Sequence, residues 1–399
     1  DGDLDIFLAV TQGSDLLLRN EGDHFVDVSF SSGIFDIPSD STCVSRADFD
    51  LDGDLDLAVG AHKDLYFLSA PNFPPADPNF VYENMGNGRF QPFEMPFLER
   101  EAMTLGVSWL PLQAGERPYL YFVNDSMGAP PDLALPNLLY TWDNGRLTNA
   151  SVDSGAQIVM AGMGISVGDL NFDQKPDILM SNEGPPVLLM SLEDVTWYDG
   201  AFSMGLGKLR ENQVFSWGTS IADFENDGDL DIWLGYGPVL EESDSNPAHQ
   251  PDAFLLNEDG IFTDRGADWI LRDNSNTRGG LFIDLDKDGQ LDLIRSSLEG
   301  PTTILYGKQH VGAWLCVELQ TDTLNRNAIG ARVEVQIGEK TWTNWMLSGS
   351  STSSGGPPVL HFGLGTADTA DEIRVYWPTG EESQYNDIPL NQSIVLAQD

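Results

Sequence analysis

Cysteine is nearly absent from this sequence. Only two occur among the 399 residues, Cys43 and Cys316, and they lie far apart in the chain. This number excludes the dense disulfide framework of a small secreted domain, and neither cysteine has the close partner that a zinc motif needs. Because cysteine is among the residue types most often found inside proteins, we expect both to be buried free thiols.

Basic residues are also scarce, with 20 lysines and arginines against 63 aspartates and glutamates, which gives a formal net charge of −43. Nucleic acids and anionic membrane surfaces are bound through basic patches, so we expect neither as a partner. No apolar run approaches the roughly 20 residues that a membrane-spanning helix needs. The sequence therefore predicts no membrane insertion.

Residues typical of catalysis are few. The five histidines are scattered, none is spaced with another as metal ligands are, and the chain has no Gly-x-Ser-x-Gly elbow, phosphate-binding loop or Cys/His pair in sequence. We expect His361 to be a packed structural residue. The sequence therefore predicts no catalytic residue and no enzymatic activity.

What the chain has in abundance is one spaced acidic motif, repeated along its first three quarters. The first complete copy, residues 48–56, carries aspartate at every odd position, in the run Asp-Phe-Asp-Leu-Asp-Gly-Asp-Leu-Asp. Close copies occupy residues 223–231 and 284–292, a weaker copy occupies residues 169–177, and a fragment occupies residues 1–5. An apolar run follows each copy, which predicts a strand after each acidic loop.

The repeats have the size and composition of β-propeller blades. The interval between the copies at 48–56 and 169–177 is about twice the other intervals, and residues 105–125 carry the flanking apolar strands without the acids, so we count six repeats. Asn-Gly and Asp-Gly dipeptides between alternating apolar runs are hairpin signals, so each repeat is expected to form about four short antiparallel strands. Such a repeat is the unit of a propeller blade.

We therefore predict an all-β fold, with a β-propeller over residues 1–308. Because the chain begins inside a copy of the motif, we expect that the propeller is truncated at its N-terminus, that it has seven blades when complete, and that any targeting segment lies upstream.

The acidic motif predicts a cation site. Carboxylates at alternate positions of a tight loop point to one centre, glycine at position 6 permits a positive φ, and the aspartate at position 9 closes the shell. An all-oxygen shell of this kind suits Ca²⁺ better than Mg²⁺. An EF-hand loop would instead close at position 12 and be flanked by helices, and a calcium β-roll would repeat every nine residues.

We predict three to five Ca²⁺ ions with a mainly structural role. The expected ligands are Asp48, Asp50, Asp52, Asp54, Asp56, Asp169, Asn171, Asp173, Asp177, Asp223, Glu225, Asp227, Asp229, Asp231, Asp284, Asp286, Asp288, Gln290 and Asp292, with Asp1 and Asp5 of the fragment. The alternative is a set of metal-free acidic turns. It is disfavoured where five acids crowd into one loop, and it stays open at residues 169–177, where Gln174 replaces glycine and Lys175 adds a positive charge.

From about Val311 the repeat gives way to alternating strands separated by glycine, asparagine and proline turns. This pattern predicts a small β-sandwich-like domain over residues 309–399. Three segments of it are distinctive: Asn-Arg-Asn-Ala-Ile-Gly-Ala-Arg at residues 325–332, His-Phe-Gly-Leu-Gly at 361–365, and Trp-Pro-Thr-Gly at 377–380. These segments resemble the ASPIC/UnbV domain, and the acidic blades resemble FG-GAP/VCBS repeats. The combination resembles the cartilage acidic protein 1-like family.

The resemblance implies an extracellular calcium-binding protein for adhesion or for interaction with a protein or a glycan. We expect it to be a monomer that is secreted or located at the cell surface or in a periplasm. The alternative is a calcium-dependent polysaccharide-active enzyme, a lyase or a hydrolase. Such an enzyme would gather arginine, lysine, histidine or tyrosine side chains around the propeller axis.

Overall fold

The computed structural model describes residues 3–11, 13–34, 40–62, 78–93, 103–126, 134–193, 195–209, 214–239, 250–266, 276–298, 300–308 and 312–398. These residues form eight β-sheets, one helical turn, α1 (Ser29–Ser32), and one 3-10 turn, η2 (Leu206–Lys208). In this part of the chain no helix has the length and apolar character needed to cross a membrane.

Six of the sheets follow one another along the chain as antiparallel meanders. They are β1–β3 (Ile6–Leu8, Leu16–Asn20, Phe25–Asp27), β4–β7 (Ser41–Ala47, Asp56–Ala61, Phe80–Asn84, Phe90–Phe93), β8–β11 (Thr104–Leu110, Tyr119–Asn124, Leu138–Asp143, Arg146–Asn149), β12–β15 (Ile165–Gly168, Asp177–Met180, Val187–Ser191, Trp197–Asp199), β16–β19 (Ser216–Ala222, Asp231–Tyr236, Ala253–Glu258, Ile261–Asp264) and β20–β22 (Thr277–Ile283, Asp292–Ser297, Thr303–Leu305).

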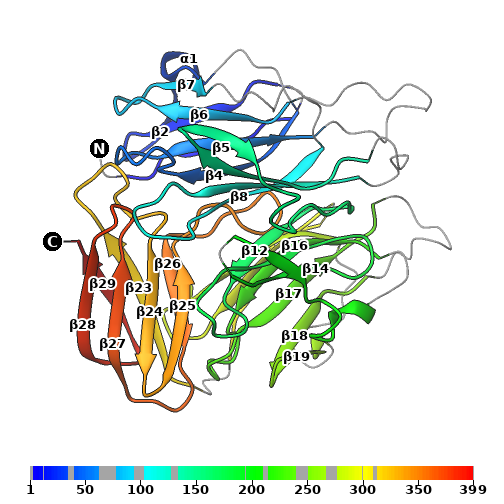
Figure 1. The fold of residues 1–399 in the computed structure, drawn as a ribbon, viewed down its shortest axis with the longest axis vertical. Helices are drawn as coiled ribbons and strands as arrows, with labels where there is room; N and C mark the ends of the chain where they lie inside the picture. The colour runs from blue at the N-terminus through cyan, green and yellow to red at the C-terminus, as the bar shows by residue number, and fades with distance from the viewer. Residues whose placement is uncertain are drawn as a thin grey trace.

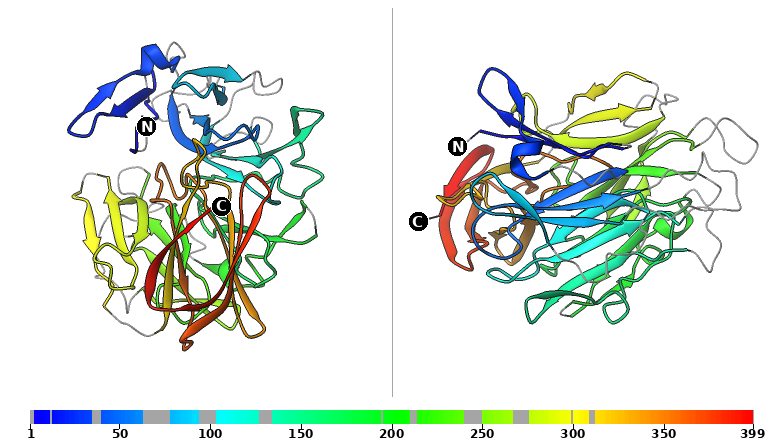
Figure 2. Two further views of the ribbon diagram at one scale, coloured as in Figure 1. Left: turned by 90° about the vertical axis from the view of Figure 1, so that its left-hand side faces the viewer. Right: turned by 90° about the horizontal axis from the view of Figure 1, so that it is seen from above.

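The six sheets are the blades of a β-propeller, and Figure 2 shows them fanned about a common centre. The predicted fold class is therefore confirmed. The repeat without acids, at residues 105–125, forms the strands β8 and β9 of a complete four-stranded blade. A seventh blade stays a prediction.

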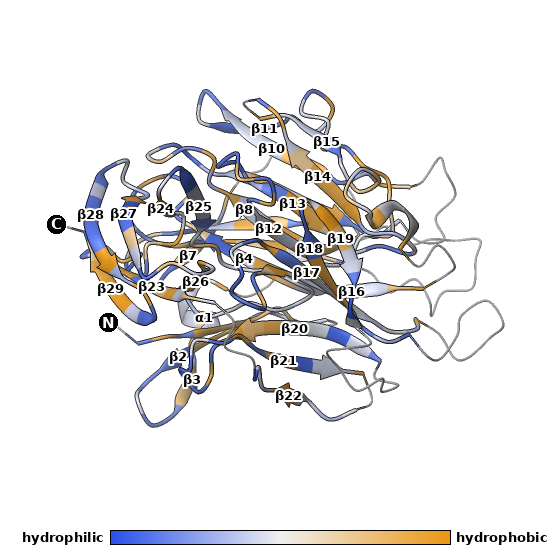
Figure 3. Ribbon diagram, turned by 90° about the horizontal axis from the view of Figure 1, so that it is seen from below, coloured by the Kyte–Doolittle hydropathy of each residue, from blue (hydrophilic) through white to orange (hydrophobic). Residues whose placement is uncertain are grey.

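The second strand of each blade explains the apolar runs in the sequence. Every residue of β5, β13 and β17 is buried, because neighbouring blades cover both faces of the sheet. Figure 3 shows the hydrophobic character of β13 and β17. Outer strands such as β19 alternate between buried and exposed residues.

The first strands of the blades lie next to one another around the propeller axis. The hydroxyl of Thr42 on β4 donates to the carbonyl of Thr104 on β8 at 2.7 Å, and the hydroxyls of Ser166 on β12 and Thr219 on β16 lie 2.8 Å apart. Short polar side chains therefore join neighbouring blades at the centre.

The last two sheets form a C-terminal sandwich, which Figure 1 shows beside the propeller. One sheet has the order β26-β23-β29 (Val359–Gly363, Trp314–Gln320, Gln392–Ala397), and the other has the order β25-β24-β27-β28 (Lys340–Trp345, Arg332–Ile337, Thr369–Tyr376, Glu382–Pro389). Leu315, Val333, Val375 and Trp377 are fully buried in the core of this unit. The predicted β-sandwich-like fold after the propeller is confirmed.

One segment of the sandwich enters the propeller. We call residues 346–358, between β25 and β26, the axial segment. Ser351 forms an antiparallel bridge with Ile165 of β12, its hydroxyl accepts from the Thr219 backbone N–H at 3.1 Å, and the hydroxyl of Ser353 donates to the Thr42 carbonyl at 2.9 Å. Because β4, β12 and β16 belong to three different blades, the axial segment occupies the centre of the propeller.

Candidate metal sites on one face of the propeller

The four complete acidic motifs lie at equivalent places in four blades. Residues 48–56, 169–177, 223–231 and 284–292, which we call the acid loops, each connect the first strand of a blade to the second. The last residue of each acid loop pairs with the residue that precedes the loop, as Asp56 pairs with Ala47. All four loops therefore lie on the same face of the propeller, which we call the loop face.

The aspartate at position 1 shapes each loop through its carboxylate. In the first acid loop, Asp48 accepts the backbone N–H of Asp52 on Oδ1 and that of Gly53 on Oδ2, both at 3.0 Å. The same two hydrogen bonds recur in the other three loops, where Asp169, Asp223 and Asp284 accept from the residues at positions 5 and 6. The four loops thus share one backbone conformation.

The aspartate at position 9 ties the loop to its blade. Oδ2 of Asp56 accepts the N–H of Phe49 at 2.9 Å, and Oδ1 accepts the N–H of Asn84 on the third strand at 2.8 Å. Asp177, Asp231 and Asp292 make the equivalent pair of bonds. Burial raises the pKa of Asp56 to about 8 and that of Asp231 to about 9. These carboxylates therefore anchor the fold in addition to facing the loop.

The fragment at the N-terminus keeps this anchor. Asp5 lies at position 9 of its motif, and its Oδ1 accepts the N–H of Asn20 on the next strand at 2.8 Å, as Asp56 accepts from Asn84. Asp1 lies outside the described residues, so the rest of that predicted site stays a prediction.

The backbone conformation at position 6 accounts for the glycines found there in three of the four acid loops. Gly53, Gly228 and Gly289 have φ values of 97°, 99° and 89°, which side chains rarely adopt. Gln174 holds the same place in the weaker loop at φ 66°, so this loop keeps the shared shape at the expense of backbone strain. The Lys175 amine donates to the Leu192 carbonyl.

Two observations make the acid loops suitable for a cation. In two of them the side-chain oxygens of positions 1, 3 and 9 converge within 4.8 Å of one another, in the sets Asp48, Asp50, Asp56 and Asp284, Asp286, Asp292. In three of them an oxygen at position 7 is buried without a hydrogen-bond partner in the described chain: Asp54 Oδ1, Asp229 Oδ1 and Gln290 Oε1. A buried oxygen without a donor is costly unless a cation or water meets it.

The carboxylates also repel one another. The pKa of Asp54 is raised to about 7 by burial and then by Asp52, Asp48 and Asp50, and the pKa of Glu225 is raised to about 7 by burial and then by Asp227. A bound divalent cation would supply two positive charges at the centre of this repulsion. The residues present fit a hard cation with oxygen ligands.

The weaker loop fits less well. Its position 3 is Asn171, whose amide donates to Oδ2 of Asp173 at 3.2 Å, so this side chain is engaged with its neighbour. Asp169 is buried, and burial raises its pKa to about 6. Residues 169–177 therefore differ from the other acid loops in their side chains and in the strained backbone at Gln174, while they keep the same loop hydrogen bonds.

A contact that the sequence did not predict lies beside these loops. Cys316 Sγ is 3.4 Å from His361 Nδ1, and His361 Nε2 is 2.7 Å from Oδ1 of Asn226 in the third acid loop. Nδ2 of Asn226 donates to the Gly289 carbonyl, so its Oδ1 accepts the proton of His361 Nε2. Burial raises the pKa of Cys316 to about 12 and lowers that of His361 to about 4, so both groups are neutral.

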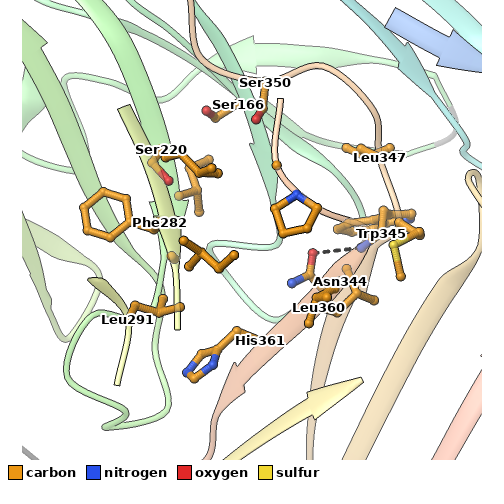
Figure 4. A pocket seen from close by; sticks show the side chains of 18 of the residues that line it. Ser166, Ser220, Phe282, Leu291, Asn344, Trp345, Leu347, Ser350, Leu360 and His361 are labelled. Atoms are coloured by element: carbon orange, nitrogen blue, oxygen red, sulfur yellow. Dashed lines mark hydrogen bonds between the residues drawn. The ribbon is translucent and has the colours of Figure 1, made fainter. Parts of the chain in front are cut away.

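Cys316 and His361 line a cavity of about 410 Å³ between the propeller and the C-terminal sandwich. Figure 4 shows His361 and Leu291 on one side of it and Ser166 and Ser350 on the other. The predicted burial of both free thiols is confirmed. No sequence spacing links Cys316 to His361, because the pair is created by the pairing of β23 with β26.

The comparisons with known proteins agree with this architecture. The model of the FG-GAP-like repeat matches residues 1–59, and the model named ASPIC and UnbV matches residues 321–399. Cartilage acidic protein 1 of Xenopus tropicalis is 25% identical over an alignment that covers 96% of this chain and 69% of that protein. The resemblance to the cartilage acidic protein 1-like family that the sequence predicted is confirmed by these matches.

Other relatives match over shorter stretches. Human cartilage acidic protein 1 is 29% identical over an alignment that covers 62% of this chain and 38% of the human protein. The aligned part of this chain therefore spans well under half of the human protein. Among solved structures, a Synechocystis apocarotenoid oxygenase has a TM-score of 0.39 and 10% identity, with 77% of this chain and 70% of that chain covered, a likeness too weak to carry an argument.

Proposed function

We propose that this protein is an extracellular calcium-binding β-propeller protein that binds a protein or glycan partner in adhesion. The cations have a structural role in this proposal. Its relatives are named for cartilage and for acidity, and the chain shares the acidity, with 63 aspartates and glutamates. Because the aligned part of the human protein is only 38% of its length, the role in adhesion is carried over as a proposal.

The calcium proposal rests mainly on the side-chain oxygens at position 7 of the acid loops, which in three of the loops are buried without a hydrogen-bond partner among the described residues. Asp54, Asp229 and Gln290 each hold a buried oxygen without a described hydrogen-bond partner, at the same place in three loops of one shape. The same buried oxygen, unpartnered within the described chain, at the same position of three loops supports a common ligand, a cation that these oxygens coordinate. Among biological cations, Ca²⁺ best tolerates six to eight oxygen ligands in a flexible loop.

The occupied axis supports a binding role over the alternative of a polysaccharide-active enzyme. The axial segment contacts three blades at the centre, where such an enzyme would place its basic residues. Arg46 donates to the Ser348 hydroxyl at 2.8 Å, and Arg278 donates to the Pro238 carbonyl at 2.8 Å while it lies over the Trp217 ring. Both guanidinium groups are thus engaged within the fold.

The proposal is tested in two steps on the purified chain. Isothermal titration calorimetry of chelator-treated protein should show saturable Ca²⁺ binding, with little response to Mg²⁺ at the same concentration. A glycan array and binding assays with purified matrix proteins, each with and without Ca²⁺, then test for a partner. Absence of Ca²⁺ binding at millimolar concentration would refute the calcium proposal. A partner that binds equally well in chelator would show that partner binding does not depend on Ca²⁺.

A further inference from the structure

The acid loops do more than surround a centre, because their outer sides touch the C-terminal sandwich. The carbonyl of Gly228, at position 6 of the loop 223–231, accepts two hydrogen bonds from β25. The Trp342 indole Nε1 donates at 2.7 Å and the Lys340 amine donates at 2.8 Å. The residue that gives the loop its turn is thus held by the neighbouring unit.

Asn226, at position 4 of the same loop, is fully buried and joins three segments. Its backbone carbonyl accepts the Gly365 N–H at 3.0 Å, and its Oδ1 accepts from His361 Nε2 at 2.7 Å. Its Nδ2 donates at 2.9 Å to the carbonyl of Gly289, which is position 6 of the next acid loop. One side chain therefore links two acid loops to the sandwich.

The other acid loops also contact the sandwich, each through a different kind of contact. The carbonyl of Gly53 accepts the Asn325 N–H at 2.9 Å. The Phe172 ring lies 6.4 Å from the Trp342 ring, edge to face. A Cβ at Gly289 would lie 1.9 Å from Trp314 Nε1, so the sandwich is packed against this glycine too closely for any side chain.

One backbone geometry serves both purposes. In the loop 223–231, the chain turns through the positive φ angles of Asn226 (58°) and Gly228 (99°), and the Asp223 carboxylate accepts the backbone N–H groups of Asp227 and Gly228 at 3.2 and 2.8 Å. The same turn directs the Gly228 carbonyl and the Asn226 side chain outward to β25 and β26. A loop that opened under the repulsion of its acids would lose both arrangements at once.

We propose that the C-terminal sandwich positions the acid loops for calcium, so that cation binding and docking of the sandwich strengthen each other. This inference rests on the calcium binding proposed above and deepens it. Coupling of this kind is reciprocal, because whatever the cation adds to docking, docking must add to cation affinity. Trp342, Lys340 and His361 are positioning residues in this account.

The structure also contains contacts between the two units that involve no acid loop. A Cβ at Gly115, in the acid-poor connection between β8 and β9, would lie 2.8 Å from Gly380 Cα. The axial segment is bonded to β12 and β16. These contacts should persist without cation, so chelation should loosen the sandwich over the acid loops and leave it attached at the axis.

The first experiment is a thermodynamic cycle on the full chain with Trp342→Phe, which removes the indole N–H and leaves a smaller aromatic ring. Loss of one hydrogen bond that forms only in the docked state should weaken Ca²⁺ binding by about two- to tenfold in calorimetry. The melting temperature should fall in Ca²⁺ and stay near the wild-type value in chelator.

The matched control is Trp217→Phe. Trp217 also donates its indole N–H to a backbone carbonyl, that of Gly237 at 2.8 Å, but it lies in β16 away from the acid loops. Its loss should lower the melting temperature equally with and without Ca²⁺ and leave the affinity unchanged. If Trp342→Phe behaves as Trp217→Phe does, the Trp342 contact is merely structural and the coupling is overturned.

The second experiment is hydrogen exchange of the wild-type chain with and without Ca²⁺. Protection should fall in chelator at residues 340–345 and 361–365, and it should persist at residues 350–352 and around Gly380. Equal protection of the sandwich in both conditions, in a protein that calorimetry shows to bind Ca²⁺, would refute the coupling and leave the calcium proposal standing. A protein that binds no Ca²⁺ would remove both.

Discussion

Two neighbouring blades have the same fold, but only one of them carries an acid loop. In the blade β4–β7, Ala47 pairs with Asp56 across an acid loop, and in the blade β8–β11, Leu110 pairs with Tyr119 across a connection of the same length that has one acidic residue. Both blades have four antiparallel strands, with fully buried residues such as Val59 and Phe122. The acids are therefore not needed for strand pairing or for the core.

The acid-poor connection is held by other means. Arg117 lies 4.7 Å from the centre of the Trp142 ring, and the Trp142 indole donates to the Pro118 carbonyl at 2.9 Å. A cation–π contact and one hydrogen bond thus hold this connection, whereas the equivalent connection of blade β4–β7 contains five carboxylates. Under the calcium proposal, the acid loops depend on a bound cation in a way that blade β8–β11 does not.

Chelation should produce the largest difference between the two blades. Each site filled at 100 times its dissociation constant adds about 2.7 kcal/mol to the free energy of unfolding, so several sites together should raise the melting temperature markedly. Differential scanning calorimetry in millimolar Ca²⁺ and in excess chelator measures the shift. Hydrogen exchange should show the loss in β4–β5 and β16–β17 before β8–β9, and equal loss in all blades would contradict the comparison.

Asp56→Asn should be the most damaging single change in an acid loop. Asp56 is fully buried and accepts from Phe49 and Asn84, and the amide can accept only one of these two bonds. We expect a loss of about 1 to 3 kcal/mol, even in chelator. Tyr119→Phe at the equivalent place of blade β8–β11 is the control and should cost less than about 0.5 kcal/mol. Urea denaturation compares them, and equal losses would argue against the anchoring role.

The effect of pH should have opposite signs with and without cation. The folded-state pKa values of Asp48, Asp223 and Asp54, at about 6, 7 and 7, are raised above the ordinary value of 3.8, so the metal-free fold prefers the protonated acids. That stability is present below pH 3.8 and is lost as the pH rises through about 6 to 7. In chelator the melting temperature should therefore fall between pH 5.5 and pH 8.

With Ca²⁺ present the protons compete with the cation, so affinity should rise over the same range of pH, by up to about tenfold per unit for each proton released. Calorimetry at several pH values in matched ionic strength measures this. A Ca²⁺ affinity that did not change with pH would show that other groups hold the cation.

The smallest expected effect distinguishes the weaker acid loop from the others. Lys175 adds a positive charge near residues 169–177, and its amine donates to Leu192. Lys175→Gln should raise the Ca²⁺ affinity of this loop about twofold, because it removes one positive charge that repels the cation through a high dielectric. Lys308→Gln, outside the acid loops, is the control for net charge. A larger gain for the control would mean that overall charge, and not this loop, sets the affinity.

Much of this architecture could be predicted from the sequence because the signals are local. The spacing of the repeats revealed the acid-free blade, whose strands β8 and β9 were found where the interval placed them. The shared shape of the acid loops follows from aspartate at positions 1 and 9 and glycine at position 6, all within nine residues.

What the sequence could not predict depends on contacts between distant segments. Asn226 occupies a position of the motif that carries no pattern, and its link to His361 spans 135 residues. The axial segment, rich in serine and glycine, has the composition of a flexible linker, yet it is bonded into the propeller centre. The anchoring bonds of the position-9 aspartates reach a third strand whose register the sequence leaves open.

The most direct test of the central claim is the number of Ca²⁺ ions bound per chain, measured by equilibrium dialysis of chelator-treated protein. The account predicts at least three ions, in the loops at residues 48–56, 223–231 and 284–292, and one fewer in Asp50→Ala, because Asp50 belongs to one converging set of carboxylates. Binding of fewer than one ion per chain at millimolar Ca²⁺, or an unchanged number in Asp50→Ala, would contradict it.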